Sequence, residues 1–287
     1  MNRRDFGKLA AGALTAAAVE GAPKIDSKFA GVQIGAQTYS FRDRPLDACI
    51  AAMKEIGLGE AELYNGHIEP KDPEALKEFR KNPPLDQMRQ VRKKFDGAGI
   101  ELYALNYSFG KGWSDEELAR GFDIAQAMGV KYITSSTQVS MAKRLDPLAQ
   151  KYKIVVAFHN HSNMAQDEFA RPQDWEEALR GASKYLAINL DIGHFTAAGY
   201  DPVSFLNEHH ARIITLHIKD RKTNQGANMP FGQGDTKIKE VLKILKTKKY
   251  PIPANIEYEY NGGDTVEEVK KCFAYCKAAL AGELQRR

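Results

Sequence analysis

The chain has 287 residues, of which 43% are hydrophobic and 27% charged, so it can bury a sizeable core and is not expected to be disordered. It carries 41 basic and 37 acidic residues, and this near balance argues against a surface that follows the phosphates of a nucleic acid. Mean hydropathy is −0.48, and no run reaches the roughly 20 apolar residues that a membrane span needs.

Residues 1–23 are predicted to be a targeting signal that precedes the folded domain. They combine a short basic start, an alanine-rich stretch and small residues before a proline. The pattern RRDFGK that begins at Arg3 resembles the twin-arginine export signal. We therefore expect export to the periplasm, cleavage near Ala18 or Ala22, and a barrel domain over residues 24–287. An amphipathic or frayed N-terminal helix is the alternative.

From Val32 onward, short β-rich runs alternate with longer segments of helical periodicity. Strands are predicted over residues 32–41, 60–64, 100–108, 131–138, 153–161, 187–194, 213–220 and 254–260. Helices are predicted over residues 45–57, 84–99, 114–129, 144–152, 171–182, 201–211, 235–250 and 264–280.

Helix-terminal signals support these boundaries. Ser114 and Asp264 are predicted N-caps with a glutamate three residues later, and Gly57, Gly99 and Gly129 are predicted to stop helices. Strict strand–helix alternation through eight units, without a linker or second domain, predicts an α/β protein with a single (β/α)8 TIM barrel. A doubly wound open sheet is the alternative, but no glycine-rich phosphate loop follows an early strand.

In such a barrel, functional side chains gather at the C-terminal ends of the strands. Four consecutive predicted strands end near His159, Asp191, His217 and Glu257. Buried carboxylates without partners are costly, which favours a common cation over four separate core residues. Two imidazoles and two carboxylates suit one divalent ion such as Mn, Co, Zn or Fe, with Mg also open. We therefore predict that these four side chains bind one divalent metal ion.

The strings NLDIGH, TLHIKD and ANIEYE, with MPFGQGD at 229–235, resemble the sugar phosphate isomerase/epimerase group of xylose isomerase-like TIM barrels. That group includes ketose 3-epimerases, hydroxypyruvate isomerases and inosose dehydratases, and the likeness covers nearly all of residues 32–280. It implies that Asp191, His217 and Glu257 are metal ligands. By the same resemblance, the histidine and lysine of these strings are polar partners of the site.

His159 departs from the epimerase pattern. The fifth strand of the epimerases usually ends in a glutamate that binds metal and also moves a proton, whereas this strand ends in Phe158, His159, Asn160 and His161. The histidine is similar to that of inosose-dehydratase-like members. A nitrogen that ligates metal is not free to accept a proton, so the two-glutamate mechanism is open to question.

The resemblance implies a metal-dependent isomerase or epimerase that acts on a sugar or keto-sugar through proton abstraction and a metal-stabilised enediolate. Glu257 is the predicted base, and Glu259 is the alternative because residues two apart share one strand face. His159, His194 and Lys219 complete the predicted catalytic group.

Polar and aromatic residues near other strand ends are candidates for substrate binding, with barrel or rim packing as the alternative for each. They are Gln37, Tyr39, Glu62, Asn106, Trp113 and His161. Only Arg42 and Arg221 follow strands, which leaves no evident bidentate clamp for a phosphate. We therefore expect an unphosphorylated carbohydrate as the substrate and neither nucleic acid nor a membrane as a partner. A homo-oligomer stays open.

Three other functions compete with the isomerase. A lyase or hydratase would use the same metal site, for example in elimination from a 3-keto-glycoside, and His159 favours this alternative. A non-catalytic sugar-binding barrel would keep the shape without the reaction. A nuclease similar to the apurinic endonucleases would need more metal ligands and a basic groove.

Overall fold

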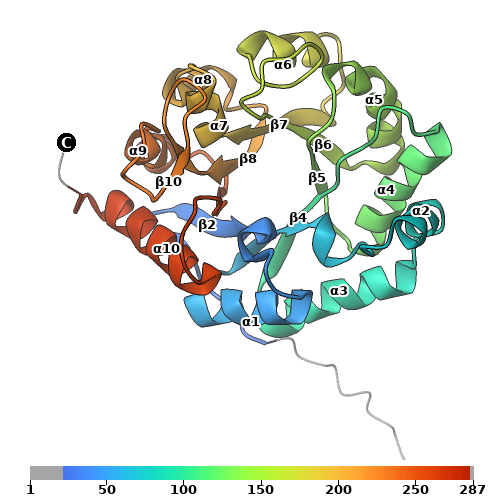
Figure 1. The fold of residues 1–287 in the computed structure, drawn as a ribbon, viewed down its shortest axis with the longest axis horizontal. Coiled ribbons are helices and arrows are strands. Elements are labelled where there is room, and N and C mark those ends of the chain that lie inside the picture. The colour runs from blue at the N-terminus through green and yellow to red at the C-terminus, as the bar shows by residue number, and fades with distance from the viewer. Residues whose placement is uncertain (1–21, 285–287) are drawn as a thin grey trace, which may run out of the picture.

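A computed structural model describes residues 22–284, so all but the last two residues of the predicted signal lie outside the described part. Eight parallel strands form a closed barrel, which confirms the predicted fold class (Figure 1). In barrel order they are β2 (Val32–Gln37), β11 (Ala254–Ile256), β8 (Ile213–Ile218), β7 (Leu186–Asp191), β6 (Val155–His159), β5 (Tyr132–Ser135), β4 (Glu101–Asn106) and β3 (Glu60–Tyr64). Pairing of β2 with β3 closes the ring.

The helices form a ring outside the strands (Figure 1). They are α1 (Leu46–Ile56), α2 (Pro73–Lys81), α3 (Leu85–Ala98), α4 (Asp115–Ala127), α5 (Ala142–Tyr152), α6 (Pro172–Leu179), α7 (Ile192–Ala197), α8 (Pro202–His209), α9 (Ile238–Lys248) and α10 (Thr265–Ala281). Short 3-10 helices are η1 (Thr38–Phe41), η2 (Asn65–His67) and η3 (Val139–Met141). In the described part of the chain, no helix is long and apolar enough to cross a membrane.

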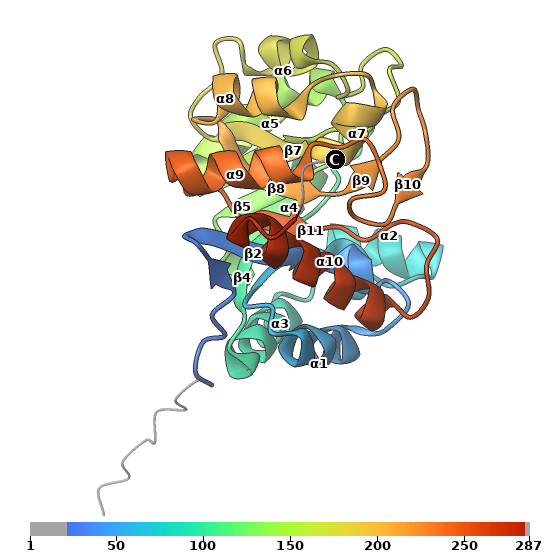
Figure 2. The ribbon, with the colours of Figure 1, turned by 90° about the vertical axis from the view of Figure 1, so that its left-hand side faces the viewer.

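Two short strand pairs lie outside the barrel wall. At the N-terminal end of the barrel, β1 (Lys28–Phe29) pairs antiparallel with β2. At the opposite end, β9 (Asp220–Arg221) and β10 (Asn228–Met229) form a hairpin that follows β8. Figure 2 shows this hairpin on the same side of the molecule as α7 and α2. The β9–β10 hairpin therefore stands over the end of the barrel where the candidate residues gather.

The predicted helix ends are largely as observed. Ser114 forms a complete capping box with Glu117, and Asp264 accepts hydrogen bonds from two backbone N–H groups at the start of α10. Gly57 and Gly99 adopt left-handed conformations at the ends of α1 and α3. These local signals mark the helix ends because they satisfy backbone groups that the helix leaves without partners.

The structure corrects the predicted strand over 187–194. The strand β7 ends at Asp191, whose carboxylate accepts a hydrogen bond of 2.6 Å from the backbone N–H of His194 and so starts α7. Several other strands are also shorter than predicted, including β11, which ends at Ile256 rather than at residue 260. The helix α2 is a further element outside the predicted set, although Asp72 before Pro73 is a typical helix start; its one buried residue is Phe79.

Strand alternation gives the barrel an apolar outside and a polar inside. Leu190, Leu216 and Ile256 are fully buried in the hydrophobic core, whereas the residues that follow them carry the polar groups of the site. Farther down, Gly35 leaves room for the interior side chains, because a Cβ there would lie 2.1 Å from Asn255 Oδ1. The barrel interior is thus a buried polar column with the candidate site at one end.

Candidate metal centre and active site

The four predicted ligands come together at the C-terminal ends of neighbouring strands. His159 and Asp191 are the last residues of β6 and β7, His217 lies in β8, and Glu257 directly follows β11. One nitrogen or oxygen atom from each residue lies within 4.8 Å of those of the other three, and all four residues are buried. The adjacency of β11, β8, β7 and β6 in the sheet explains this arrangement.

Each of the four residues holds one buried atom that has no hydrogen-bond partner among the described residues. These atoms are His159 Nε2, Asp191 Oδ2, His217 Nδ1 and Glu257 Oε2. Buried polar atoms are normally satisfied, so four orphans that converge on one place require an explanation. A divalent cation would satisfy all of them, and the mixed nitrogen and oxygen donors suit zinc, manganese, cobalt or iron. The residues present therefore fit a metal ion.

His217 is held between two carboxylates. Its Nδ1 lies 2.9 Å from Glu257 Oε2, and its Nε2 lies 2.9 Å from Glu62 Oε2. Burial lowers the pKa of His217, but the charges of Glu62 and Glu257 outweigh it and raise the pKa well above the ordinary value. The hydroxyl of Thr134 donates to Glu62 over 2.6 Å, so Glu62 is itself fixed. A carboxylate behind a ligating imidazole orients the ring for metal binding.

The ring of His159 is also positioned by a polar neighbour. Its Nδ1 lies 3.1 Å from Ser136 Oγ, which leaves Nε2 facing Asp191 Oδ2 at 3.6 Å. Burial raises the pKa of Asp191, but the charge of Lys219 outweighs that effect, so the pKa of Asp191 is well below the ordinary value. Asp191 is therefore ionised and can bind a cation.

Lys219 lies among three carboxylates. Its Nζ is 3.0 Å from Asp191 Oδ2, 2.9 Å from Glu257 Oε2 and 2.6 Å from Glu259 Oε2. Burial lowers the pKa of Lys219, but the three negative charges raise it above the ordinary value, so the side chain is a cation. Burial likewise raises the pKa of Glu257, and Lys219 and His217 bring it below its usual range.

His194 stands between two cations at the edge of the site. Its Nε2 lies 3.0 Å from Lys219 Nζ, and its Nδ1 lies 2.7 Å from a guanidinium nitrogen of Arg221. Burial and the charge of Lys219 hold the pKa of His194 well below its ordinary value, so the imidazole is neutral. Arg221 and Lys219 can only donate, so the neutral imidazole, which has one accepting nitrogen, can accept from just one of them.

Of the predicted substrate contacts, His161 lies beside the metal cluster on its exposed side. It is exposed, with its ring 5.0 Å from that of His159 and 5.2 Å from that of His194. Tyr39 is half-buried beside the ring of Tyr64. These two positions are open to a molecule that enters from the C-terminal end of the barrel.

The remaining four candidates have partners of their own. Glu62 is fully buried behind His217, and Asn106 donates to Thr134 in the same buried network. Gln37 accepts a hydrogen bond from the backbone of Tyr39 and caps η1. Trp113 packs against Tyr107, and the guanidinium of Arg80 lies over its ring.

Sequence reasoning missed the layer of residues behind the ligands. Ser136 and Thr134 hold His159 and Glu62, while Asn189 Nδ2 lies 3.0 Å from His217 Nε2. Asn189 could have been found, because it lies two residues before Asp191 and so shares its strand face. Ser136 follows β5 in a loop, where no periodicity marks its direction.

The loop that contains MPFGQGD is fastened to the end of β8 by Asp220. Its carboxylate accepts hydrogen bonds from the backbone N–H groups of Gly232, Gly234 and Thr236. A Cβ at Gly234 would lie 1.9 Å from Asp220 Oδ1, so the loop needs glycine there. Asp220 thus has a structural role in holding this loop.

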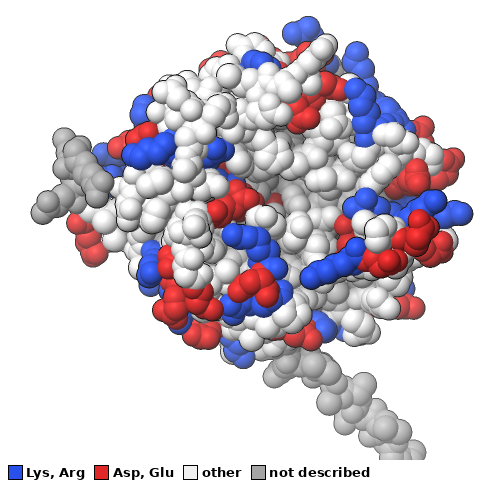
Figure 3. All heavy atoms as spheres, viewed as in Figure 1, with Lys and Arg blue, Asp and Glu red and all other residues white. Residues whose placement is uncertain are grey.

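Figure 3, a space-filling view from the same side as Figure 1, shows a hollow at the centre of that face, with charges of both signs around it and no continuous basic band.

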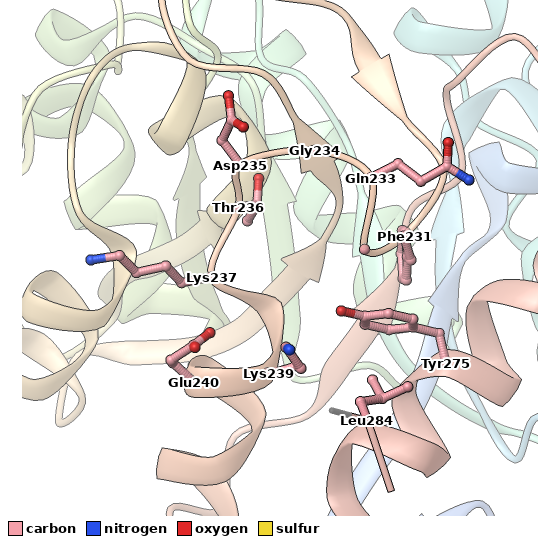
Figure 4. Close-up of a pocket in the computed structure, with 11 residues that line it drawn as sticks. Phe231, Gln233, Gly234, Asp235, Thr236, Lys237, Lys239, Glu240, Tyr275 and Leu284 are labelled. Atoms are coloured by element: carbon pink, nitrogen blue, oxygen red, sulfur yellow. The ribbon is translucent and has the colours of Figure 1, made fainter. Parts of the chain in front are cut away.

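A separate pocket of about 530 Å³ lies between the MPFGQGD loop, the start of α9 and α10. Figure 4 shows Phe231 and Tyr275 on one side of this pocket and Lys237 and Glu240 on the other. None of the four candidate ligands lines it.

Residues 50–277 match the family model described as xylose isomerase-like TIM barrel. The chain belongs to this xylose isomerase-like family. A stretch of 92 residues is 32% identical to L-ribulose-5-phosphate 3-epimerase UlaE of Escherichia coli and covers 32% of each chain. The chain thus spans about a third of the length of the curated relatives it matches.

Solved structures of the xylose isomerase-like type share the fold over most of the chain. The IolI protein with a bound zinc atom is 15% identical, with a TM-score of 0.66 over 89% of this chain and all of that one. The probable 3-DHS dehydratase AsbF of Bacillus anthracis is also 15% identical, with a TM-score of 0.62 over 89% of this chain and all of the other. At this level of identity, the likeness shows the fold alone.

Proposed function

We propose that this protein is a divalent-metal-dependent isomerase or epimerase that acts on a sugar or keto-sugar. The observation that carries the proposal is the convergence of four buried atoms that have no hydrogen-bond partner among the described residues, one each from His159, Asp191, His217 and Glu257. When bound, a divalent ion would stabilise the negative charge that forms on the substrate oxygen after proton removal. Family membership and the epimerase relative support a sugar as the substrate class.

The side chains around the ligands supply the groups for proton transfer. Glu257 is ionised and lies at the mouth-facing end of β11, so its carboxylate accepts the proton from the carbon beside the carbonyl. Glu259, two residues later and partly exposed, is the alternative acceptor. Lys219 donates from its ammonium to a substrate oxygen, and His194, whose Nε2 lies 3.0 Å from Lys219 Nζ, is a further polar contact at the same edge of the site.

A lyase or dehydratase is the second candidate, and His159 favours it. An epimerase needs one group to remove a proton and a second to return a proton to the opposite face of the same carbon. Here His159 stands at the end of β6, where epimerases usually have a glutamate, and its Nε2 faces Asp191. The strand β6 therefore lacks the carboxylate that would be the second proton-transfer group. Elimination needs only one base and a proton donor for the leaving group, and the ammonium of Lys219 is a protonated group beside the cluster.

The proposal is tested by metal analysis together with a product assay. Asp191→Ala is expected to lose bound metal and activity together, whereas Glu257→Gln keeps part of the metal and loses proton transfer. Asp86→Ala, on the exposed surface of α3, is the matched control and should leave both unchanged. Wild-type metal retention by Asp191→Ala would contradict the ligand assignment.

A panel of free ketoses and 3-keto-glycosides separates the two reactions. An epimeric or isomeric product seen by NMR supports the isomerase. New ultraviolet absorbance from an unsaturated product, without any epimer, would contradict the isomerase and support the lyase. Unchanged substrate throughout the panel, with sugar binding intact, would favour a non-catalytic binding barrel.

We further propose that the substrate is unphosphorylated. Of the two arginines near the strand ends, Arg221 donates to the carbonyl of Gly226 through two nitrogens and to Ser162 through the third. Arg221 therefore has no free pair of N–H groups for a phosphate, and Arg42 already donates through Nη1 to the carbonyl of Tyr258. A phosphorylated ketose with a higher kcat/KM than its free form would contradict this.

Export by the twin-arginine route is also part of the proposal, on the evidence of the RRDFGK pattern at Arg3. Substitution of Arg3 and Arg4 by lysine should retain the protein in the cytoplasm. Fractionation of cells that express the two forms measures this, and equal periplasmic amounts would argue against the signal.

A further inference from the structure

The ammonium of Lys219 lies on the same oxygen atoms that the proposed metal would need. Nζ is 3.0 Å from Asp191 Oδ2 and 2.9 Å from Glu257 Oε2, and these two oxygens are among the four orphan atoms of the cluster. The contacts are close enough for charge attraction but are not oriented as hydrogen bonds. Lys219 thus neutralises both carboxylates without satisfying them.

Lys219 lies close to four polar atoms. Besides Asp191 Oδ2 and Glu257 Oε2, Nζ lies 2.6 Å from Glu259 Oε2 and 3.0 Å from His194 Nε2. An ammonium has three N–H donors, so it cannot donate to all four atoms together. Its shortest contact is with Glu259, which is also the most exposed of the three carboxylates, with a side chain 22% accessible.

The first carbons of the Lys219 side chain are held in place, whereas its ammonium can contact different carboxylates. A Cβ at Gly193 would lie 2.8 Å from both Cβ and Cγ of Lys219, so α7 presses directly against the start of this side chain. Lys219 is 2% exposed and cannot leave for solvent without a rearrangement. A rotation about the outer torsions is enough to move the ammonium between the ligand oxygens and Glu259, because all three already lie within 3.0 Å of Nζ.

We propose that Lys219 and the divalent metal compete for Asp191 and Glu257, and that Glu259 holds the ammonium when the metal is bound. Without metal, Lys219 keeps two buried carboxylates neutralised, which they require in a low-dielectric interior. With metal, two cations cannot share the same oxygens, so the ammonium moves fully onto Glu259. This inference rests on the proposed metal site and assigns Glu259 a positioning role that acts through Lys219.

Calorimetric titration of the metal-stripped full-length protein with MnCl2 tests the competition. Lys219→Met should bind Mn²⁺ about tenfold more tightly, because the competing cation is gone. Glu259→Gln should bind it about tenfold more weakly, because Lys219 then stays on the ligands. Lys222→Met is the matched control: this exposed lysine of the same segment pairs with Asp235, and its loss should leave the affinity unchanged.

The double variant distinguishes competition from simple through-space charge effects. If Glu259 acts through Lys219, Glu259→Gln has no further effect in the Lys219→Met background. An equal weakening in both backgrounds would overturn the proposal, as would an unchanged affinity of Lys219→Met. Wild-type protein that binds neither Mn²⁺ nor Zn²⁺ would overturn the proposed function as well, so the two failures are distinguishable.

A structural measurement on the wild type keeps the proposal falsifiable if Lys219→Met does not fold. Crystals with Mn²⁺ should show Lys219 Nζ more than about 3.5 Å from Asp191 Oδ2 and Glu257 Oε2, beyond hydrogen-bond distance, with the Glu259 contact kept. Metal in the cluster together with an unmoved ammonium would overturn it.

Discussion

Glu62 Oε2 lies 2.9 Å from His217 Nε2 although the two residues are 155 positions apart in the chain. The pair is fully buried, and the other oxygen of Glu62 accepts from Thr134. It couples β3 to β8 across the barrel interior and leaves Nδ1 of His217 facing Glu257. Loss of the Glu62 carboxylate should therefore disturb the orientation of His217 while all four candidate metal ligands stay in the protein.

We expect Glu62→Ala to weaken metal binding by a factor of about 10 to 100, the usual effect of removing a carboxylate behind a ligating histidine. Calorimetric titration with Zn²⁺ measures it. Glu116→Ala, at an exposed position of α4, is the control for loss of a glutamate. An affinity equal to that of the wild type would mean that Glu62 does not orient His217.

Gly193 and Gly97 offer a matched pair of helix glycines. A Cβ at Gly193 would lie 2.8 Å from Lys219 and from its backbone oxygen, whereas a Cβ at Gly97 in α3 meets nothing within 4 Å. Gly193→Ala should cost about 1–3 kcal/mol through overpacking and displace Lys219. Gly97→Ala should stabilise the protein by roughly 0.5–1 kcal/mol through reduced backbone entropy.

Denaturant unfolding of the two variants gives these free energies. The informative result is the opposite sign of the two effects, since both replace glycine by alanine within a helix. If Gly193→Ala were as stable as Gly97→Ala, the contact between α7 and Lys219 would be looser than the structure has it.

The barrel and its ligands were accessible from the sequence for a physical reason. Alternation of apolar and polar residues on β7, β8 and β11 marks one inward face, and parallel strands bring their C-terminal ends together, so Asp191, His217 and Glu257 had to converge. The pattern could not predict where side chains in the loops point, because loops have no periodicity. Arg221 reaches back from the β9–β10 hairpin to His194, and no periodicity in residues 220–229 predicts that path.

The position of Glu62 shows a second feature that the sequence could not predict. Its position near the end of β3 predicts a substrate contact, and alternation does point it inward. Whether an inward residue meets substrate or another side chain depends on what lies opposite across the barrel, and here that is His217. Such pairs join strands far apart in sequence, so a pattern within one strand cannot contain them.

Metal removal should lower thermal stability. A ligand that binds only the folded state stabilises it by about 2.7 kcal/mol when its concentration is 100 times the dissociation constant. For a domain of this size, that corresponds to a rise in Tm of roughly 5–11 °C. Differential scanning calorimetry with EDTA and with added Zn²⁺ measures the shift, and Asp191→Ala should abolish it. A parent protein that is indifferent to chelation would instead favour the metal-free binding barrel.

Glu60, at the N-terminal end of the barrel interior, should make stability depend on pH. Burial and the charges of Glu101 and Glu62 raise its pKa from 4.5 to about 8. The folded state therefore holds a proton that the unfolded state has released, so stability falls as pH rises from about 5 to 8 and levels off above that. The loss should be of the order of a few kcal/mol.

Glu60→Gln removes the titrating group and should remove this loss, so its stability relative to the parent should rise through the same pH range. Urea unfolding at pH 5, 6, 7, 8 and 9 measures the difference. Glu176→Gln, exposed on α6, should give a difference that does not change with pH. A flat profile for Glu60→Gln would mean that the carboxyl is ionised in the folded protein, and that Asn255 or a water molecule satisfies the charge at the barrel floor.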